Sequence, residues 1–221
     1  MLTVSEKWKK VYPGAGAGLL VVEQVLNPLK CEALDREKQE TVKALQSRFK
    51  NRNELLCFEP LRLYDEYYRR FKKTYHVRQQ MDSVIFKNKP IPSVATLVEA
   101  MFMAELKNGL LTAGHDLSSL KPPLSLSVGK VSDFYTGMGG KPIEVKADDM
   151  MISDQTGIIS SILGGPDLRT KITPDTCNAV FAVYAPAGIS DEMIELHFDD
   201  IIRYIRLVST KAYVAERRIF R

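Results

Sequence analysis

Residues 158–178 read IISSILGGPDLRTKITPDTCN. An apolar run ends at a Gly-Gly-Pro corner, residues 164–166, and the chain leaves through the β-branched and aromatic run 179–184. Between them stands a dense set of hydrogen-bonding side chains: Asp167, Arg169, Thr170, Thr173, Asp175, Thr176 and Asn178. Because glycine has no Cβ, such a corner allows the backbone to come close to a neighbouring group. The segment is interpreted either as a polar loop that joins two core strands or as part of a binding site.

The composition of the 221-residue chain is that of an ordinary globular protein, with 45% apolar and 26% charged residues. No run of 18 apolar residues occurs, so no membrane span is expected. The first residues, MLTVSEKWKK, lack the apolar core and cleavage site of a secretory signal. We therefore expect a cytoplasmic protein with no membrane partner.

Charge is distributed unevenly along the chain. Residues 1–90 contain 18 Lys+Arg and 11 Asp+Glu, a net charge of +7, and the remainder carries −3. This distribution suits an extended anionic ligand that contacts mainly the first part of the chain. Scattered solubilising charge is the alternative interpretation.

Neither a metal site nor a cofactor motif is predicted. The three cysteines form no CxxC pair and the three histidines no metal-ligand spacing; they are Cys31, Cys57, Cys177, His76, His115 and His197. The glycines of residues 14–18 precede a strand, which is the reverse of a dinucleotide fingerprint. Residues 137–141 lack the spacing of a P-loop and indicate a glycine hairpin.

Helical spacing of apolar residues predicts five helices, over residues 4–10, 29–51, from 60 onward, 94–107 and 191–209. Ser93 and Ser190 are the predicted N-caps of the last two. The helix that begins near Pro60 carries an aromatic stripe of Tyr64, Tyr67, Tyr68, Phe71 and Tyr75, flanked by Arg and Lys. Such a stripe could stack on nucleic-acid bases, but its helical period favours a buried face.

Alternation and short apolar runs predict strands over residues 18–26, 124–128, 143–145, 150–153, 158–163 and 179–184. Residues 110–117 are expected to form an irregular piece, and residues 211–221 fit a strand or a helix end equally well. Helices and strands do not alternate regularly, which favours an α+β fold over a doubly wound one.

Five short segments carry a family resemblance: residues 92–100 (PSVATLVEA), 113–117 (AGHDL), 151–154 (MISD), 161–165 (SILGG) and 173–180 (TPDTCNAV). In this order, residues 91–188 resemble the B3/B4 domain of the phenylalanyl-tRNA synthetase β chain. Residues 13–85 resemble the N-terminal extension of small stand-alone B3/B4-domain proteins. The resemblance implies three layers, with helices flanking a central β-sandwich of unusual topology. It also implies an N-terminal α/β extension, 1–90, packed on a B3/B4-like domain, 91–221, as one compact unit.

In the synthetase this domain removes mischarged tyrosyl groups from the tRNA end, without a metal or a nucleophilic side chain. The resemblance implies a site between the turn 113–116 and the corner at Gly164–Gly165. The substrate-binding residues that it implies are Gly114, His115, Asp116, Gly164, Gly165, Asp167, Arg169 and Thr170. Arg169 could bind a carboxylate or phosphate and Asp167 an amine, whereas a simple loop ion pair between them is the alternative.

Two departures from the family pattern bear on the chemistry. Editing synthetases carry a histidine where this chain has Ala113, and often a glutamate where it has Pro166. His115 is offset from the family histidine by two residues. No catalytic residue is therefore assigned, and the stretch favours binding over catalysis.

Three hypotheses for function follow from the resemblance. The first is a module that binds tRNA or aminoacyl-tRNA. The second is a hydrolase that deacylates mischarged aminoacyl-tRNA in trans. The third is a pocket that binds a free amino acid or similar metabolite without catalysis. Aminoacylation is not expected, because no part of the chain resembles a synthetase catalytic core.

Overall fold

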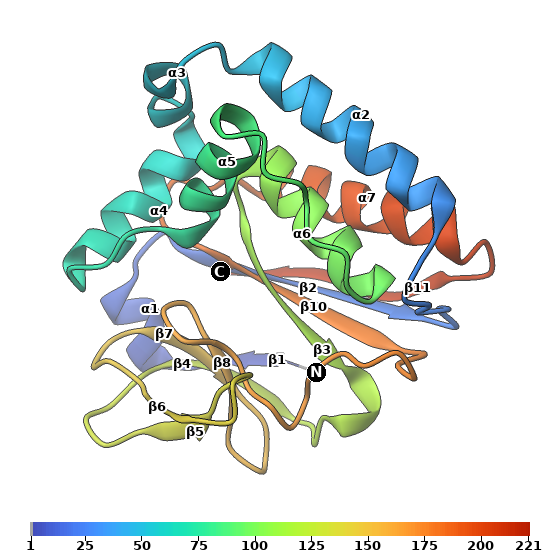
Figure 1. Cartoon of the computed structure of the whole chain (residues 1–221). Coiled ribbons are helices and arrows are strands. Elements are labelled where there is room, and N and C mark those ends of the chain that lie inside the picture. Colours follow the sequence, from blue (N-terminus) through green and yellow to red (C-terminus); the bar gives the residue numbers. More distant parts are fainter. Residues whose placement is uncertain (1) are drawn as a thin grey trace.

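The computed structural model describes residues 2–221, and they form three layers (Figure 1). Helices cover one face of a four-stranded sheet, and a second sheet lies on its other face (Figure 1). The elements are helices and antiparallel or mixed sheets, so the α+β class predicted from the sequence is confirmed.

The middle layer is a sheet in the order β11–β2–β10–β3. Its strands are β11 (Tyr213–Phe220), β2 (Gly16–Glu23), β10 (Ala179–Ala185) and β3 (Leu111–Asp116), and every neighbouring pair is antiparallel. All seven residues of β10 are buried. Burial between two layers explains why β10 reads as a continuous apolar run rather than an alternating one.

The second sheet has the order β1–β4–β7–β8–β9. Its strands are β1 (Leu2–Val4), β4 (Leu124–Val128), β7 (Met150–Ser153), β8 (Ile158–Ser161) and β9 (Gly165–Pro166). A separate hairpin of β5 (Phe134–Thr136) and β6 (Pro142–Glu144) carries the predicted glycine turn. The alternating burial of β4 confirms the half-buried strand predicted there.

The helical layer contains α2 (Glu32–Arg48), α3 (Arg52–Leu56), α4 (Glu59–Arg70), α5 (His76–Phe86), α6 (Thr96–Asn108) and α7 (Asp191–Val208). A short helix, α1 (Glu6–Val11), precedes β2, and a single 3₁₀ turn, Leu117–Ser119, follows β3. Ser190 caps α7 as predicted, because its side chain accepts a hydrogen bond from the Met193 N–H.

The prediction for the start of α6 was wrong. The helix begins at Thr96 after an N-cap at Ala95, and no side chain of the cap residue takes part. Instead, Asn27 Oδ1 accepts a hydrogen bond from the Leu97 N–H at 2.8 Å. The cap therefore comes from a residue distant in sequence, which local spacing around Ser93 could not reveal.

The structure corrects a second expectation and decides a question that the sequence left open. Residues 111–116 form strand β3 rather than an irregular piece, because they pair along β10 from Tyr184 to Ala179. The C-terminal tail, which the sequence left undecided, is strand β11 and pairs with β2. Because β2 comes from the first 90 residues and lies inside this sheet, strands from both parts of the chain share one layer. The division at residue 90 stays a prediction.

Four of the five stripe residues are buried, and the stripe runs along α4 into the turn before α5. Helix α4 ends at Arg70, and Lys72 adopts a left-handed conformation with φ of 56° before α5 begins. Tyr64, Tyr67, Tyr68 and Tyr75 are buried. The Tyr68 hydroxyl donates to the Ile162 carbonyl at 2.9 Å, which joins α4 to the chain two residues before the Gly-Gly-Pro corner.

Candidate functional site

The Gly-Gly-Pro corner connects β8 to β9, and each glycine has its own structural reason. A Cβ on Gly164 would lie 2.2 Å from the Tyr135 hydroxyl oxygen, so no side chain fits there. Gly165 has φ of 72°, a left-handed conformation that favours glycine, and open space around it. The Tyr135 hydroxyl donates to the Gly165 carbonyl at 2.7 Å and fixes the corner against β5.

A chain of hydrogen bonds links β3 to the segment after the corner. The Thr170 hydroxyl donates to Asp167 Oδ1, and His115 Nδ1 lies 2.7 Å from the same hydroxyl oxygen. A hydroxyl has one proton to donate, so His115 Nδ1 must donate to Thr170. The Asp116 N–H donates to the Thr170 carbonyl at 2.8 Å, which adds a backbone hydrogen bond between β3 and this segment.

The tautomer assigned by this chain leaves His115 Nε2 without a proton. Burial is the main cause that lowers the His115 pKa, to about 3, and the nearby Arg169 charge adds to it. The ring is fully buried, and Nε2 has no hydrogen-bond partner among residues 2–221. His115 is therefore a neutral packing residue that orders the loop from inside.

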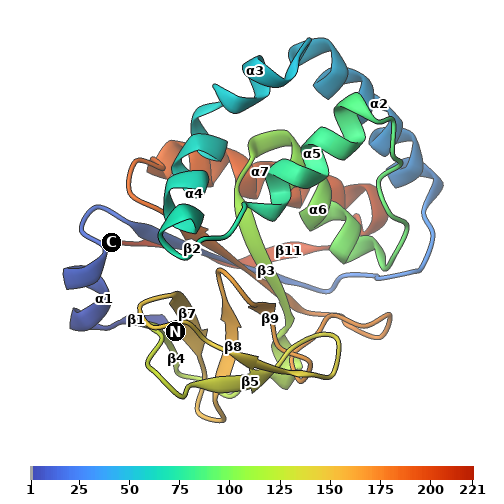
Figure 2. The same cartoon turned by 60° about the vertical axis from the view of Figure 1, so that its left-hand side comes forward.

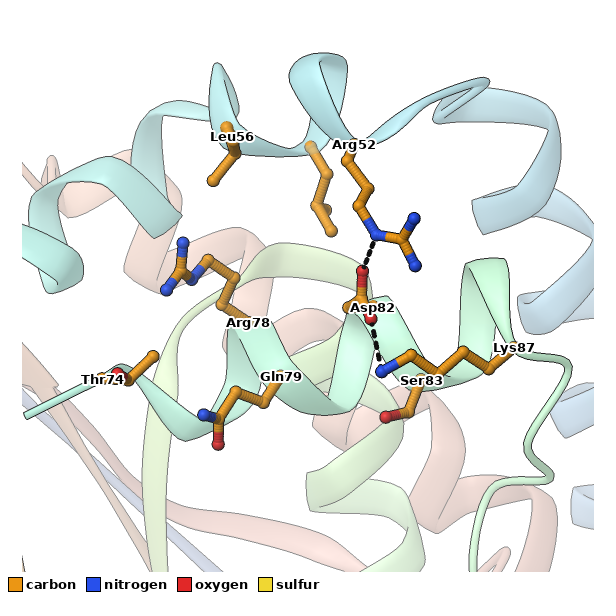
Figure 3. Close-up of a pocket in the computed structure, with 9 residues that line it drawn as sticks. Arg52, Leu56, Thr74, Arg78, Gln79, Asp82, Ser83 and Lys87 are labelled. Carbon is orange, nitrogen blue, oxygen red and sulfur yellow. Dashed lines mark hydrogen bonds and ion pairs between the residues drawn. The ribbon is translucent and has the colours of Figure 1, made fainter.

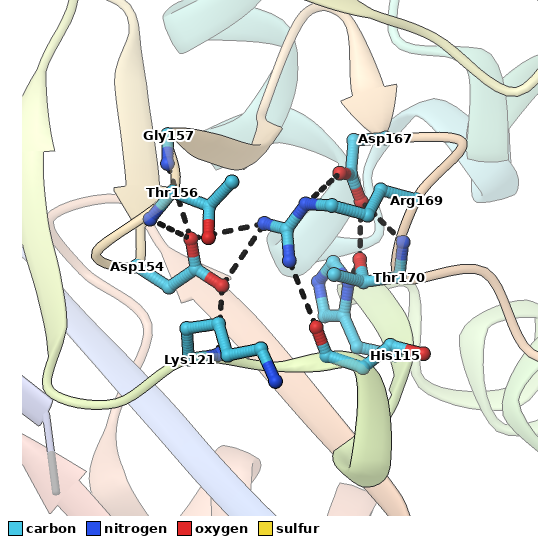
Figure 4. Close-up of polar contacts among 9 residues, drawn as sticks. His115, Lys121, Asp154, Thr156, Gly157, Asp167, Arg169 and Thr170 are labelled. Carbon is cyan, nitrogen blue, oxygen red and sulfur yellow. Dashed lines mark hydrogen bonds and ion pairs between the residues drawn. The ribbon is translucent and has the colours of Figure 1, made fainter.

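Arg169 is held by protein groups on three sides (Figure 4). One guanidinium nitrogen lies 2.9 Å from both carboxylate oxygens of Asp154, and another donates to the Ser119 carbonyl at 2.8 Å. Its Nε lies 3.6 Å from Asp167 Oδ2. All three guanidinium nitrogens of Arg169 thus face protein acceptors, while 34% of the side chain remains exposed.

Asp154 is the centre of this arrangement, and it was not among the residues predicted to form the site. Its side chain is fully buried, and its oxygens accept hydrogen bonds from the backbone N–H groups of Lys121, Thr156 and Gly157 (Figure 4). Burial acts to raise the Asp154 pKa, but these hydrogen bonds and Arg169 outweigh it and lower the pKa below its usual value. Asp154 is therefore a charged anchor for the loop.

Asp116 also has a local structural role. Its Oδ1 accepts from the Ser118 N–H at 2.8 Å, and its Oδ2 accepts from the Thr176 hydroxyl at 2.7 Å. Burial opposes ionisation of Asp116, and the hydrogen bonds from Ser118 and Thr176 lower its pKa overall. The carboxylate fixes the start of the 3₁₀ turn after β3.

A cavity of about 220 Å³ lies on the inner side of the corner. Gly165 and Pro166 line it from the corner, and Ala113 from β3. The remaining walls come from α5, α6 and β10, through residues that include His76, Gln80, Glu105 and Tyr184. Ala113 and Pro166, at which editing synthetases carry polar residues, thus line one cavity.

Glu105 is the acidic residue of this cavity. It is buried on α6, and its Oε1 accepts a hydrogen bond from the Thr112 N–H at 2.7 Å. Burial raises the pKa of Glu105 to about 8, so the carboxyl group is protonated at neutral pH and can donate a hydrogen bond. A glutamate within an otherwise apolar helix face was the sequence signal for this site.

The edge strand β3 also has backbone groups that point away from its own sheet, next to Ala113, which lines the cavity. The N–H groups of Thr112 and Asp116 point away from β10, as their bonds to Glu105 and Thr170 show. Because backbone groups alternate along a strand, the N–H and carbonyl of Gly114 point the same way. The Gly114 backbone is therefore the predicted site residue that presents hydrogen-bonding groups at an open sheet edge.

The predicted site residues fall into two groups in the structure. His115, Asp116, Asp167, Arg169 and Thr170, together with Asp154, form a connected polar network, which we call the loop network. Gly165 lines the cavity, whereas Asp167 and Arg169 line a separate hollow of about 240 Å³ on the outer side of the corner. The cavity residues Glu105, Gln80 and Tyr184 were not identified from the sequence. They lie on α6, α5 and β10, outside the segment 158–178.

Other hollows lie in the helical layer. A groove of about 400 Å³ between α3 and α5 contains Arg52, Asp82 and Lys87 (Figure 3). Asp82 pairs with both cations, at 2.6 Å from Arg52 Nε and 2.9 Å from Lys87 Nζ. Within residues 2–221, no group of His, Cys, Asp and Glu could hold a metal ion, and no helix is long and apolar enough to span a bilayer.

Comparison with known proteins shows a similarity in structure but none in sequence families or curated sequences. No protein-family model and no curated protein matches the sequence. The structure is similar to that of an N-terminal fragment of the phenylalanyl-tRNA synthetase β subunit from Pyrococcus horikoshii, with a TM-score of 0.51 and 12% sequence identity. The similarity covers 99% of this chain and 50% of that fragment. At this identity the likeness concerns the fold, and the chain spans half the length of the fragment.

Proposed function

We propose that this protein is a tRNA-related module that binds the aminoacylated end of a tRNA through a B3/B4-like domain. The observation that carries the proposal is the shared fold with the synthetase β-subunit fragment over 99% of this chain. The five motifs of the sequence resemblance and the cavity beside the corner support the same assignment.

The size and lining of the cavity suit the aminoacyl group. Its volume of about 220 Å³ is below the roughly 300–1,000 Å³ of pockets for drug-sized ligands, so it fits a group the size of an amino-acid side chain. Met101, Phe102 and Leu111 give it apolar walls, and Glu105 supplies a hydrogen-bonding group. Outward backbone groups of β3 are suited to hold the polar ester end.

Ala113 and Pro166 favour binding over hydrolysis. Neither side chain can position a water or hold an ester through a hydrogen bond. The loop network holds Arg169 against Asp154, and this makes Arg169 a structural residue in our proposal rather than a ligand for the substrate. Gly114 and Gly165 remain the proposed contacts from the predicted set.

Hydrolysis of a mischarged aminoacyl ester is the second candidate function, and Glu105 is the observation that favours it. A carboxyl group with a pKa of about 8 is in the range in which an acid–base group works at neutral pH. If Glu105 acts on the ester, Glu105→Gln will abolish deacylation of a mischarged tRNA while binding persists.

The test compares binding and hydrolysis on the same set of tRNAs. We expect tighter binding of a non-hydrolysable, amide-linked aminoacyl-tRNA than of the same tRNA without its aminoacyl group. Release of amino acid from ester-linked tRNAs is measured alongside. Equal affinity for the two forms would contradict the proposal, and thermal stabilisation by a free amino acid alone would favour a metabolite-binding protein.

A further inference from the structure

The turn between α4 and α5 carries a concentrated positive charge. Residues 69–78 contain five Lys and Arg residues and no Asp or Glu. Four of the five are exposed, and we call them the basic turn: Arg69, Arg70, Lys72 and Lys73. The turn belongs to the part of the chain that carries the net charge of +7.

The cations of the basic turn are not neutralised by neighbouring acids. Within residues 2–221, the side chains of Arg69, Lys72 and Lys73 make no ion pair. The nearby carboxylates already pair with other cations, since Glu66 lies 2.7 Å from Arg62 and Asp65 lies 3.3 Å from Arg78. This differs from the groove of Figure 3, in which Asp82 pairs with both Arg52 and Lys87.

The backbone of the basic turn is fixed before any ligand arrives. The N–H groups of Phe71 and Lys73 donate to the Tyr68 carbonyl at 3.0 and 3.1 Å, and that of Lys72 donates to the Arg69 carbonyl at 3.1 Å. The Arg70 guanidinium lies 4.8 Å from the centre of the Tyr12 ring, which holds it against α1. A preformed turn loses little conformational freedom when it binds a partner.

The position of the basic turn connects it to the cavity. The turn leads directly into α5, whose first residue, His76, lines the cavity. Tyr68, one residue before Arg69, donates to the Ile162 carbonyl, two residues before the corner, at 2.9 Å. Figure 2 shows the end of α4 that carries this turn pointing toward α1 and the second sheet. A ligand in the cavity would therefore leave it beside exposed positive charge.

We propose that the basic turn binds the phosphodiester backbone of the single-stranded RNA end whose aminoacyl group occupies the cavity. The inference rests on the proposed function and adds the surface that contacts the nucleic acid. Lysine and arginine bind phosphates as unpaired cations, and each contact releases counterions, so binding weakens as salt rises. The buried tyrosines of α4 hold the turn in place and do not stack on bases.

The experiment uses two double variants that remove the same charge from matched positions. Arg69→Gln with Lys73→Gln changes an arginine in the last turn of α4 and a lysine shortly after it. Arg206→Gln with Lys211→Gln does the same at the end of α7, and all four side chains are exposed and unpaired within residues 2–221. The ends of α4 and α7 lie on opposite sides of the molecule (Figure 1). Lys72→Gln with Lys73→Gln provides a second variant of the turn.

The probe is a tRNA acceptor-stem duplex with its single-stranded 3′ end carrying an amide-linked amino acid. We expect both turn variants to bind it roughly tenfold more weakly, and the slope of log affinity against log salt to fall by about 1.4, because two contacts are lost at about 0.7 each. We expect the α7 variant to bind within about twofold of the wild-type protein.

The outcomes separate this inference from the proposed function. If the wild-type protein binds the aminoacylated probe and all three variants bind equally well, the basic turn is not the contact and the inference is wrong. Equal weakening by the turn and α7 variants would show non-specific electrostatics and would also overturn it. No binding by the wild-type protein would overturn the proposed function, and the inference with it.

Discussion

The two sides of the Gly-Gly-Pro corner differ in polarity and in how far their polar groups are satisfied by the protein itself. The sequence pointed to the polar residues after the corner as the binding site, whereas the structure shows them bonded to one another. On the outer side, the loop network brings together many polar groups that satisfy one another, with Arg169 bound to Asp154 and Ser119. On the inner side, the cavity is largely apolar and contains the protonated Glu105. The dense polar residues thus form a structural element, and the binding site that we propose is the cavity beside it.

The largest expected effect is on the outer side. Asp154→Ala would leave Arg169 and three backbone N–H groups without their acceptor, at a cost of about 3 kcal/mol in the free energy of unfolding. Urea unfolding measures this cost. Glu40→Ala is the matched control, because Glu40 pairs with Lys43 in an exposed ion pair and its loss should cost less than about 0.5 kcal/mol. Equal costs for the two variants would show that the loop network is not an anchor.

On the inner side, we expect Glu105→Gln to make the protein increasingly more stable than the wild type as the pH rises. The folded-state pKa of Glu105 is raised to about 8 from 4.5, so the folded state holds the proton more tightly than the unfolded chain. Wild-type stability should therefore fall as the pH rises from about 4.5 to 8. Glu105→Gln removes this dependence and should gain on the order of 2 kcal/mol relative to the wild type between pH 6 and 8.

Unfolding free energies of both proteins at several pH values test this prediction. The Gln side chain keeps an oxygen for the Thr112 N–H, so the comparison isolates the proton. A difference between the two proteins that does not change with pH would mean that Glu105 is ionised in the cavity.

A smaller effect of opposite sign is expected from His115. Its folded-state pKa of about 3 is below the usual 6.5, so it contributes stability above pH 6.5 that is lost as the pH falls toward 3. His115→Asn keeps a donor for the Thr170 hydroxyl and does not titrate. We expect the variant to lose about 1 kcal/mol less stability than the wild type between pH 6.5 and 5.5.

His197 provides the internal control for this measurement. Burial lowers the pKa of His197 to about 4, and its Nε2 lies 2.7 Å from the Thr112 hydroxyl oxygen. Because the His115 variant retains His197, the loss of stability that His197 causes in acid remains in that variant. Identical acid profiles for wild type and variant would show that His115 is not the neutral residue described above.

The fold class could be predicted from the sequence because helical and alternating patterns are strong over most elements. Strand β3 could not, since its Ala-Gly-His sequence has little strand preference and its pairing with β10 decides its structure. The N-cap of α6 was missed for a similar reason, because Asn27 reaches it from another part of the chain.

The candidate site shows the same limit. Its glycine corner is local and was found, whereas the partner of Arg169 lies 15 residues away and was not assigned. Glu105 was visible as an acidic residue on an apolar helix face, but its burial beside Thr112 depends on how α6 packs on β3. Motif reasoning thus identified the neighbourhood of the cavity, and packing determined which side chains face it.

The most direct test of the central claim is to fill each side of the corner in turn. Ala113→Leu fills the inner cavity, and Thr156→Leu fills the outer hollow as a matched control. We measure the ratio of affinities for amide-linked aminoacyl-tRNA and deacylated tRNA. The account predicts that Ala113→Leu brings this ratio to one while Thr156→Leu leaves it unchanged. An unchanged ratio in Ala113→Leu, or its loss in Thr156→Leu alone, would contradict the account.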